Sequence, residues 1–239
     1  MYTYCIYKVH MYTLSMNKNK LYQDLKKQIL TLELEPGSPL DETSLSERYS
    51  ISRTPLRDVF RQLAGEGYLT IVNNRGASVS SMSHKVLRDF FLTAPLLYAS
   101  IARLAAENAK PAQIKEIKQA QIKFINAVKT GQVEDRVYWN DRFHALMGEM
   151  ADNQYLKPSY DRLLIDHARI SQTFYRPRNS EMEVRMKQAV EHHNQMIVAI
   201  EQGDSKTMVD LIIDHWELSR DFLDQFVRPE PLPTQLTVV

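Results

Sequence analysis

Three arginines at four-residue spacing are the first residues of this sequence whose types and positions could do chemistry. Arg53, Arg57 and Arg61 fall on one row of a helix. A second face of the same segment carries apolar residues at spacings of three and four: Leu56, Val59, Phe60 and Leu63. A guanidinium group bonds a guanine edge with two hydrogen bonds or pairs with a phosphate. The segment therefore predicts a helix that packs on one side and reads DNA with the other, although a solvated charged face has the same periodicity.

Four side chains in the second half of the chain could bind a metal. Asn140 and His144 stand four residues apart, so one helix face presents both to a shared cation. His193 and His215 follow on two later helical segments and can converge with them inside a bundle. Three imidazoles and an amide oxygen suit a divalent ion, with zinc, nickel and manganese as the main candidates. Histidines also occur in helical proteins for purely structural reasons, an interpretation that we keep for the other four: His10, His84, His167 and His192.

Short elements before the arginine helix must position it. Residues 21–34 keep apolar residues at helical spacing until a Glu-Pro-Gly stop at 35–37. Asp41 or Thr43 can cap a second short helix, and residues 50–52 form a turn into the arginine helix. Pro55 falls in that helix's first turn, where a missing N–H costs little.

A two-stranded ribbon is predicted after the arginine helix. Gly65 and Gly67 end the helix, residues 68–72 alternate as a strand, and residues 73–76 turn the chain into a second strand over 77–80. This order of elements is typical of a winged helix-turn-helix. Base contacts are expected from Arg53 and Arg57, and phosphate contacts from four further residues: Thr54, Arg61, Arg75 and Gly76.

The sequence pattern changes after residue 83, from a mixture of helices and strands to helices alone. From residue 84 to 226 the sequence has only three glycines and no strand alternation, which predicts helices over 84–107, 112–129, 133–150, 154–176, 181–202 and 205–226. The expected fold is mostly α, with the domains bounded as follows: a disordered leader at 1–16, a winged helix-turn-helix DNA-binding domain at 17–83, an all-helical bundle at 84–227, and a frayed tail at 228–239.

Composition limits the class of protein. The 239 residues are 44% hydrophobic and 25% charged, which is typical of a globular protein with two cores. No run approaches the ~20 apolar residues of a membrane helix, so we expect a cytoplasmic protein without a membrane partner. The net charge of +1 argues against indiscriminate coating of nucleic acid, and DNA binding must depend on local placement. The single cysteine, Cys5, excludes an internal disulfide.

The N-terminal motifs resemble a known family. Ser-Ile-Ser-Arg-Thr-Pro-Leu-Arg-Asp-Val-Phe-Arg-Gln-Leu at 50–63, followed by Glu-Gly-Tyr-Leu and Asn-Arg-Gly, is similar to the DNA-binding domain of GntR-family bacterial transcription regulators. The resemblance implies a homodimer that binds a palindromic double-stranded operator as a ligand-responsive repressor. Thr43-Ser44 stands before Leu45 where many relatives carry an arginine, so base preference is expected to differ.

The C-terminal motifs resemble the FadR-type effector domain of that family, the FCD domain. The similarity lies in Phe143-His144, Ala151-Asp152-Asn153, Glu191-His192-His193, the Ala-Ile-Glu-Gln-Gly-Asp run at 199–204, and His215. It implies that residues 84–227 bind a small-molecule effector and dimerise, with a metal held by Asn140, His144, His193 and His215.

Two departures from the subfamily pattern bear on that site. Asn140 replaces the commoner Asp, so the site loses a charge and should bind its cation less tightly. An Arg and a Glu on the first effector helix become Ala94 and Tyr98, which removes a carboxylate clamp and favours a neutral or differently anchored effector.

A regulator without enzymatic activity is therefore the expected function. One alternative is a metal-dependent hydrolase or lyase with a winged-helix appendage, because three imidazoles with an open position also equip catalytic zinc. Against it, the sequence lacks a His-Glu-x-x-His motif. A second alternative is a helical dimerisation scaffold without metal, whose histidines fill the core.

Overall fold

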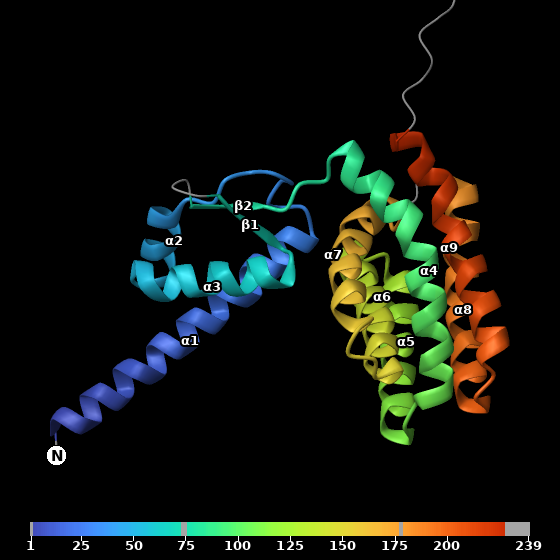
Figure 1. Ribbon diagram of the computed structural model, residues 1–239, viewed down its shortest axis with the longest axis horizontal. Helices are drawn as coiled ribbons and strands as arrows, with labels where there is room; N and C mark the ends of the chain where they lie inside the picture. The colour runs from blue at the N-terminus through green and yellow to red at the C-terminus, as the bar shows by residue number, and fades with distance from the viewer. Residues whose placement is uncertain (1, 73–75, 177–178, 228–239) are drawn as a thin grey trace, which may run out of the picture. The chain divides into compact units, whose positions relative to one another are not determined.

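The structure, a computed structural model, describes residues 2–72, 76–176 and 179–227. These residues form two compact units, one of residues up to 82 with the segment 161–169, and one of residues 83–160 with those from 170 onward. Helices dominate both, and strands occur within the described residues only in the first (Figure 1). The mostly helical fold class expected from the sequence is confirmed. The wing tip with Arg75 and the tail at 228–239 lie outside the described residues.

The first unit has the element order of a winged helix-turn-helix: α1 (Tyr2–Leu30), α2 (Glu42–Tyr49), α3 (Arg53–Glu66), β1 (Leu69–Val72) and β2 (Gly76–Val79). The strands pair antiparallel, with Leu69 opposite Val79. The segment before α2 joins the other side of β2, where Leu40 N–H donates to the Ala77 carbonyl at 2.9 Å. This connection ties the start of α2 to the wing.

Caps and a buried face define α2 and α3. Asp41 accepts a hydrogen bond from Thr43 N–H and caps α2, and Ser50 closes it in the left-handed conformation. Helix α3 begins at Arg53 with Pro55 in its first turn and ends at Gly67, whose φ of +98° suits glycine. Its four predicted apolar residues are all buried, at exposures of 2% or less: Leu56, Val59, Phe60 and Leu63. They pack with Leu21, Leu25 and Ile29 of α1 in one core.

The structure differs from the sequence-based expectation at α1 and at the end of α3. Helix α1 begins at Tyr2, so residues 2–16 continue a helix where disorder was expected. The physical reason is that neither Gly nor Pro interrupts the chain before Pro36. At its other end α1 stops at Leu30 rather than near Leu34, because Leu32 adopts a left-handed φ of +61°. Gly65 stays inside α3.

The second unit contains helices throughout its described residues. They are α4 (His84–Asn108), α5 (Pro111–Thr130), α6 (Val133–Ala151), α7 (Lys157–Phe174), α8 (Ser180–Gln202) and α9 (Ser205–Val227), with residues 161–169 of α7 assigned to the first unit. These bounds lie within a few residues of the predicted ones. Pro111 opens α5 and Asp204 caps α9 through Thr207 N–H, as expected. Pro95, expected to mark a kink or an end, lies inside α4.

Helix α4 is both long and apolar. It alone among the described helices satisfies the length and composition of a membrane span, a property that the sequence analysis did not single out. One face of α4 is buried in the bundle through Ala94, Tyr98 and Ile101. Core helices of globular proteins commonly satisfy the same criterion, so this observation by itself carries little weight.

Candidate functional site

The recognition face of α3 carries the predicted DNA-binding residues at its surface. Arg53 and Thr54 are exposed, and the side chains of Arg57 and Arg61 are 56% and 70% exposed. Gly76, at the start of β2, is half-buried. A groove beside α3 is lined by Arg57, Arg61 and Gly76 together with residues of β1. Three of the six predicted residues thus line this groove, Arg53 and Thr54 lie at the start of the same helix, and Arg75 lies outside the described residues.

Arg57 is held by a carboxylate that the sequence analysis did not single out. Its Nε donates to Glu42 Oε2 at 3.2 Å, and the Glu42 side chain is only 20% exposed. Within the described part of the chain this bond engages Nε and leaves Nη1 and Nη2 for another acceptor. Those two nitrogens are the pair that a bidentate guanine contact uses. Glu42 thereby orients the guanidinium without occupying its outer edge.

Gly76 meets the same carboxylate. Its φ is +81°, and a Cβ placed there would lie 3.3 Å from Glu42 Oε1. A side chain at this position would therefore strain the backbone and crowd the carboxylate. The first residue of α2, the middle of α3 and the base of the wing meet at Glu42.

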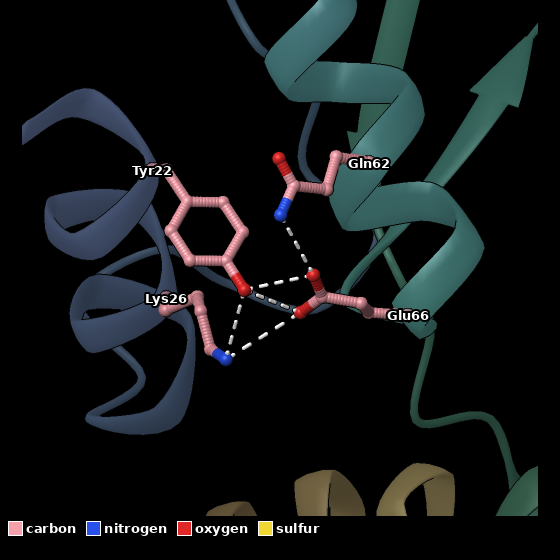
Figure 2. Close-up of polar contacts among 4 residues, drawn as sticks. All are labelled: Tyr22, Lys26, Gln62 and Glu66. Atoms are coloured by element: carbon pink, nitrogen blue, oxygen red, sulfur yellow. Dashed lines mark hydrogen bonds and ion pairs between the residues drawn. The ribbon is translucent and has the colours of Figure 1, made fainter. Parts of the chain in front are cut away.

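A polar cluster holds the far end of α3 to α1 (Figure 2). Tyr22 Oη donates to the Glu66 carboxylate at 2.7 Å from both oxygens. Lys26 Nζ lies 3.4 Å from the same carboxylate and 4.8 Å from the centre of the Tyr68 ring. Burial, followed by the hydrogen bond to Glu66, raises the pKa of the Tyr22 hydroxyl. With Gln62 Nε2 at 3.2 Å as a further donor, the Glu66 carboxylate receives bonds from both helices and links α3 to α1.

Three histidines from three helices converge in the second unit. One nitrogen from each of His144, His193 and His215 lies within 4.8 Å of the others. His144 and His193 are fully buried, at 0% exposure. Two nitrogens bound to one tetrahedral zinc ion, each at ~2.1 Å, lie about 3.4 Å apart. Small side-chain rotations would bring the three nitrogens, now within 4.8 Å of one another, to the spacing of a shared ion.

Asn140 fits the same donor set. It lies one turn before His144 on α6 and is 2% exposed. Its Oδ1 is buried and accepts no hydrogen bond from the described residues. Leaving a buried acceptor unsatisfied costs about 1–3 kcal/mol, which a coordinated cation would offset. The chemistry of these four donors fits a divalent metal.

Gln121 of α5 sets the tautomer of His193. Gln121 Nε2 donates to the Val190 carbonyl at 3.0 Å and to Asn194 Oδ1 at 2.9 Å. These acceptors orient the amide so that Gln121 Oε1 faces His193 Nδ1 at 3.1 Å. Nδ1 must then carry the proton, and Nε2 is left as the atom that can ligate. His193 is also stacked on Phe143, at 3.8 Å between ring centroids.

Sequence reasoning missed Gln121, although a signal was present. Gln121 follows Ala120 and precedes Phe124 by one turn on the buried face of α5, and its exposure is only 3%. An amide on an apolar stripe needs a buried partner. That partner is the imidazole of His193, which the sequence analysis had already named as a candidate metal-binding residue.

Aromatic rings line the centre beside these ligands. Tyr98 of α4 is 2% exposed and meets His144 edge to face at 5.5 Å and Tyr160 at 5.3 Å. Burial, then the neighbouring Tyr160 and Asp141, raises the pKa of the Tyr98 hydroxyl well above its ordinary value. Ala94, one turn earlier, is fully buried. An apolar methyl and a neutral phenol thus stand at the two positions where the resemblance to the FCD subfamily implies an Arg and a Glu.

Two of the other histidines, His167 and His192, are partly buried. Desolvation lowers the pKa of His167 to about 4, and it lowers the pKa of His192 as well. His192 lies beside His215, with ring centroids 5.9 Å apart. Neither belongs to the three-histidine group. The side chain of His10 lies outside the described residues.

Comparison with known proteins decides the family. Residues 96–218, half of the chain, match the FCD domain, and residues 17–79 match the bacterial regulatory proteins of the gntR family. The chain belongs to the GntR family. Its winged helix-turn-helix is the gntR-type DNA-binding domain, and its three-histidine group lies in the FCD domain.

Individual relatives agree with this assignment. The HTH-type transcriptional repressor RspR of Escherichia coli is 30% identical over 135 residues, 56% of this chain and 59% of that repressor. The match thus spans less than two thirds of RspR. An uncharacterized HTH-type regulator of Bacillus subtilis, YdhC, is 21% identical over 82% of this chain and 86% of its own. The solved structure of E. coli McbR/YncC covers 89% of this chain and 99% of its own, with a TM-score of 0.73 at 19% identity, and supports the fold.

Proposed function

We propose that this GntR protein is a cytoplasmic transcription regulator, acting as a repressor, that binds a palindromic operator as a homodimer and responds to a small molecule. The observation that carries the proposal is the exposed arginine face of α3, with Arg57 oriented by Glu42. Arg53 and Arg57 read base edges, whereas Thr54, Arg61, Arg75 and Gly76 contact phosphates. Two recognition helices related by a two-fold axis then enter successive major grooves.

Arg57→Ala tests base readout. A guanine contact by Arg57 is worth roughly 1–3 kcal/mol against a wrong base. We therefore expect affinity for the operator, selected from fragments of the native genome, to fall about five- to 150-fold more than affinity for random DNA. Lys20→Ala, far from the arginine row in sequence, is the control. If operator and random DNA lose the same factor with Arg57→Ala, base readout by this residue is wrong.

We further propose that Asn140, His144, His193 and His215 hold a divalent metal, with zinc, nickel and manganese as candidates. The convergence of three imidazole nitrogens and the buried Asn140 Oδ1 supports this set. A bound cation supplies a Lewis-acidic position to which an effector atom can attach. The chain's own part is to orient the ligands through Gln121 and to exclude water with Phe143 and Tyr98.

Metal content distinguishes this proposal from a metal-free scaffold. Elemental analysis of chelator-free preparations is expected to give one ion per chain for the parent protein and a large loss for His144→Ala and His193→Ala. Asn140→Asp is expected to bind the ion more tightly, because the carboxylate adds a charge to an otherwise neutral donor set. Equal metal content in the parent and both histidine variants would contradict the assignment.

We propose that the effector is anchored by the metal and by the aromatic rings of Phe143 and Tyr98, not by an arginine on α4. Buried Ala94 and Tyr98 support this, since neither side chain can form the bidentate ion pair of an arginine with a carboxylate. The protein should bind this effector without converting it, and binding should change DNA affinity. Thermal shifts over a metabolite set, followed by product analysis of each hit, test both points. Turnover of a hit would favour a metal-dependent enzyme instead.

A further inference from the structure

Helix α4 presents an apolar patch to solvent on the face opposite its buried one. Leu92 and Leu96, one turn apart, are 69% and 70% exposed. Both are large aliphatic side chains in the middle of a helix whose other face packs through Ala94, Tyr98 and Ile101. Exposing two such side chains side by side is unfavourable. The patch formed by Leu92 and Leu96 is therefore a candidate contact surface.

Two ion pairs, each with its cation before its anion in the sequence, flank this patch on the same stripe of α4. Lys85 pairs with Asp89 toward the start of the helix. Toward its end, Arg103 Nε lies 3.0 Å from Glu107 Oε1. The spacings of 3, 4 and 7 residues that connect these positions with Leu92 and Leu96 keep them all on one row. Along the row, the charges run plus, minus, apolar, plus, minus.

This order of charges is self-complementary about Leu96. Lys85 and Glu107 each lie 11 residues from Leu96, and Asp89 and Arg103 each lie 7 residues from it. If a second α4 packs antiparallel with Leu96 at the two-fold axis, every cation on the row faces an anion of the other copy. The outer pairs then stand about 16 Å from the axis, at 1.5 Å per residue. A parallel arrangement in register would instead bring Lys85 opposite Lys85.

We propose that this face of α4 is the contact between two copies of the chain, packed antiparallel about Leu96. The inference rests on the homodimer of the proposed function and names its surface. Leu92 and Leu96 exclude water at the centre, and the pairs Lys85–Glu107 and Asp89–Arg103 between copies set the register. A membrane is a poor occupant, because the opposite face of α4 is packed within the bundle and the row ends in charges on both sides.

Charge exchange between copies tests the register. In a homodimer of Lys85→Glu, or of Glu107→Lys, both outer contacts join like charges. We expect the dimer dissociation constant of each variant to rise roughly tenfold in sedimentation experiments at low salt. In a heterodimer of the two variants both outer contacts again join opposite charges, so co-expressed, differently tagged chains should pair with each other in preference to themselves. Each variant also breaks a pair within its own α4, but mixing does not repair that damage, so recovery reports contact between copies.

Leu96→Glu tests the apolar centre. It should convert the dimer to a monomer with an unchanged helical circular dichroism spectrum, while Ile122→Glu, at an α5 position that is 64% exposed, should leave the dimer intact. A parent protein that sediments as a monomer would refute the dimer of the proposed function itself. A dimeric parent whose Leu96→Glu variant stays dimeric, or whose two charge variants show no preference for each other, would refute only the α4 contact.

Discussion

Replacing Gln121 by leucine should weaken metal binding although Gln121 is not a ligand. The change removes the acceptor that lies 3.1 Å from His193 Nδ1, in a side chain that is 3% exposed. The imidazole is then free to move its proton to Nε2, the atom that must ligate. Loss of such a partner typically costs 10–100-fold in metal affinity, which corresponds to about 1.4–2.7 kcal/mol.

The stability of the metal-free protein separates this effect from damage to the fold. Gln121→Leu leaves the buried Nδ1–H without its acceptor and removes two donated bonds, so we expect it to cost about 1–3 kcal/mol in urea unfolding. Gln119→Leu, at an exposed position on the same helix, is the matched control.

Chelator competition under conditions where all three proteins are folded gives the metal affinities. We expect Gln119→Leu to match the parent and Gln121→Leu to fall by at least tenfold. If Gln121→Leu binds metal within a factor of two of the parent, then the tautomer of His193 is not set by this amide. The argument that assigns Nε2 as the ligating atom would then fail.

Three further predictions follow from contacts outside the metal centre. Glu42→Ala should release Arg57 and reduce the preference for operator over random DNA about three- to tenfold in competition anisotropy, and equal losses on both DNAs would contradict an orienting role. Tyr22→Phe should lower the free energy of unfolding by about 1–2 kcal/mol, since the Glu66 carboxylate loses its phenolic donor; an unchanged urea midpoint would contradict this. Burial lowers the pKa of His167 to about 4 in the folded protein, so unfolding takes up a proton between about pH 6.5 and 4. The free energy of unfolding should therefore decrease by about 1–3 kcal/mol as the pH is lowered across that window. A His167→Leu variant with the same pH dependence would contradict this.

Local chemistry explains why most of the fold was predictable from the sequence. The apolar row of α3 at Leu56, Val59 and Phe60 has to be buried, and Pro55 and Gly67 mark its start and end. The long helices of the second unit follow from the same rules of spacing and capping. Both boundaries expected for α1 differed from the observed ones, for opposite reasons. At residues 2–16 no helix breaker stands in the sequence, whereas the stop at Leu30 depends on a left-handed leucine that no propensity favours.

The site was predictable only where its residues share an element or a motif. The arginine row and the Asn140–His144 pair are readable because helical spacing places their members together. Contacts between distant segments were not, and these include Arg57 with Glu42, Tyr22 with Glu66 and His193 with Gln121. Each joins residues from different helices, so no periodicity within one helix reveals it. In two of these cases the missed residue, Glu42 or Gln121, orients a group whose own role is visible in the sequence.

The donor set proposed for the metal bears on the class of effector that the site can accept. Asn140 and three neutral imidazoles contribute no formal charge, so a divalent ion bound to them keeps its full charge inside a buried site. An uncompensated charge in such surroundings is unfavourable. A ligand group that brings negative charge directly to the ion relieves that cost, and the absence of an arginine at Ala94 then matters little. Asn140 and Ala94 are thus compatible with each other in the proposed site, because both favour attachment of the effector to the ion rather than to α4.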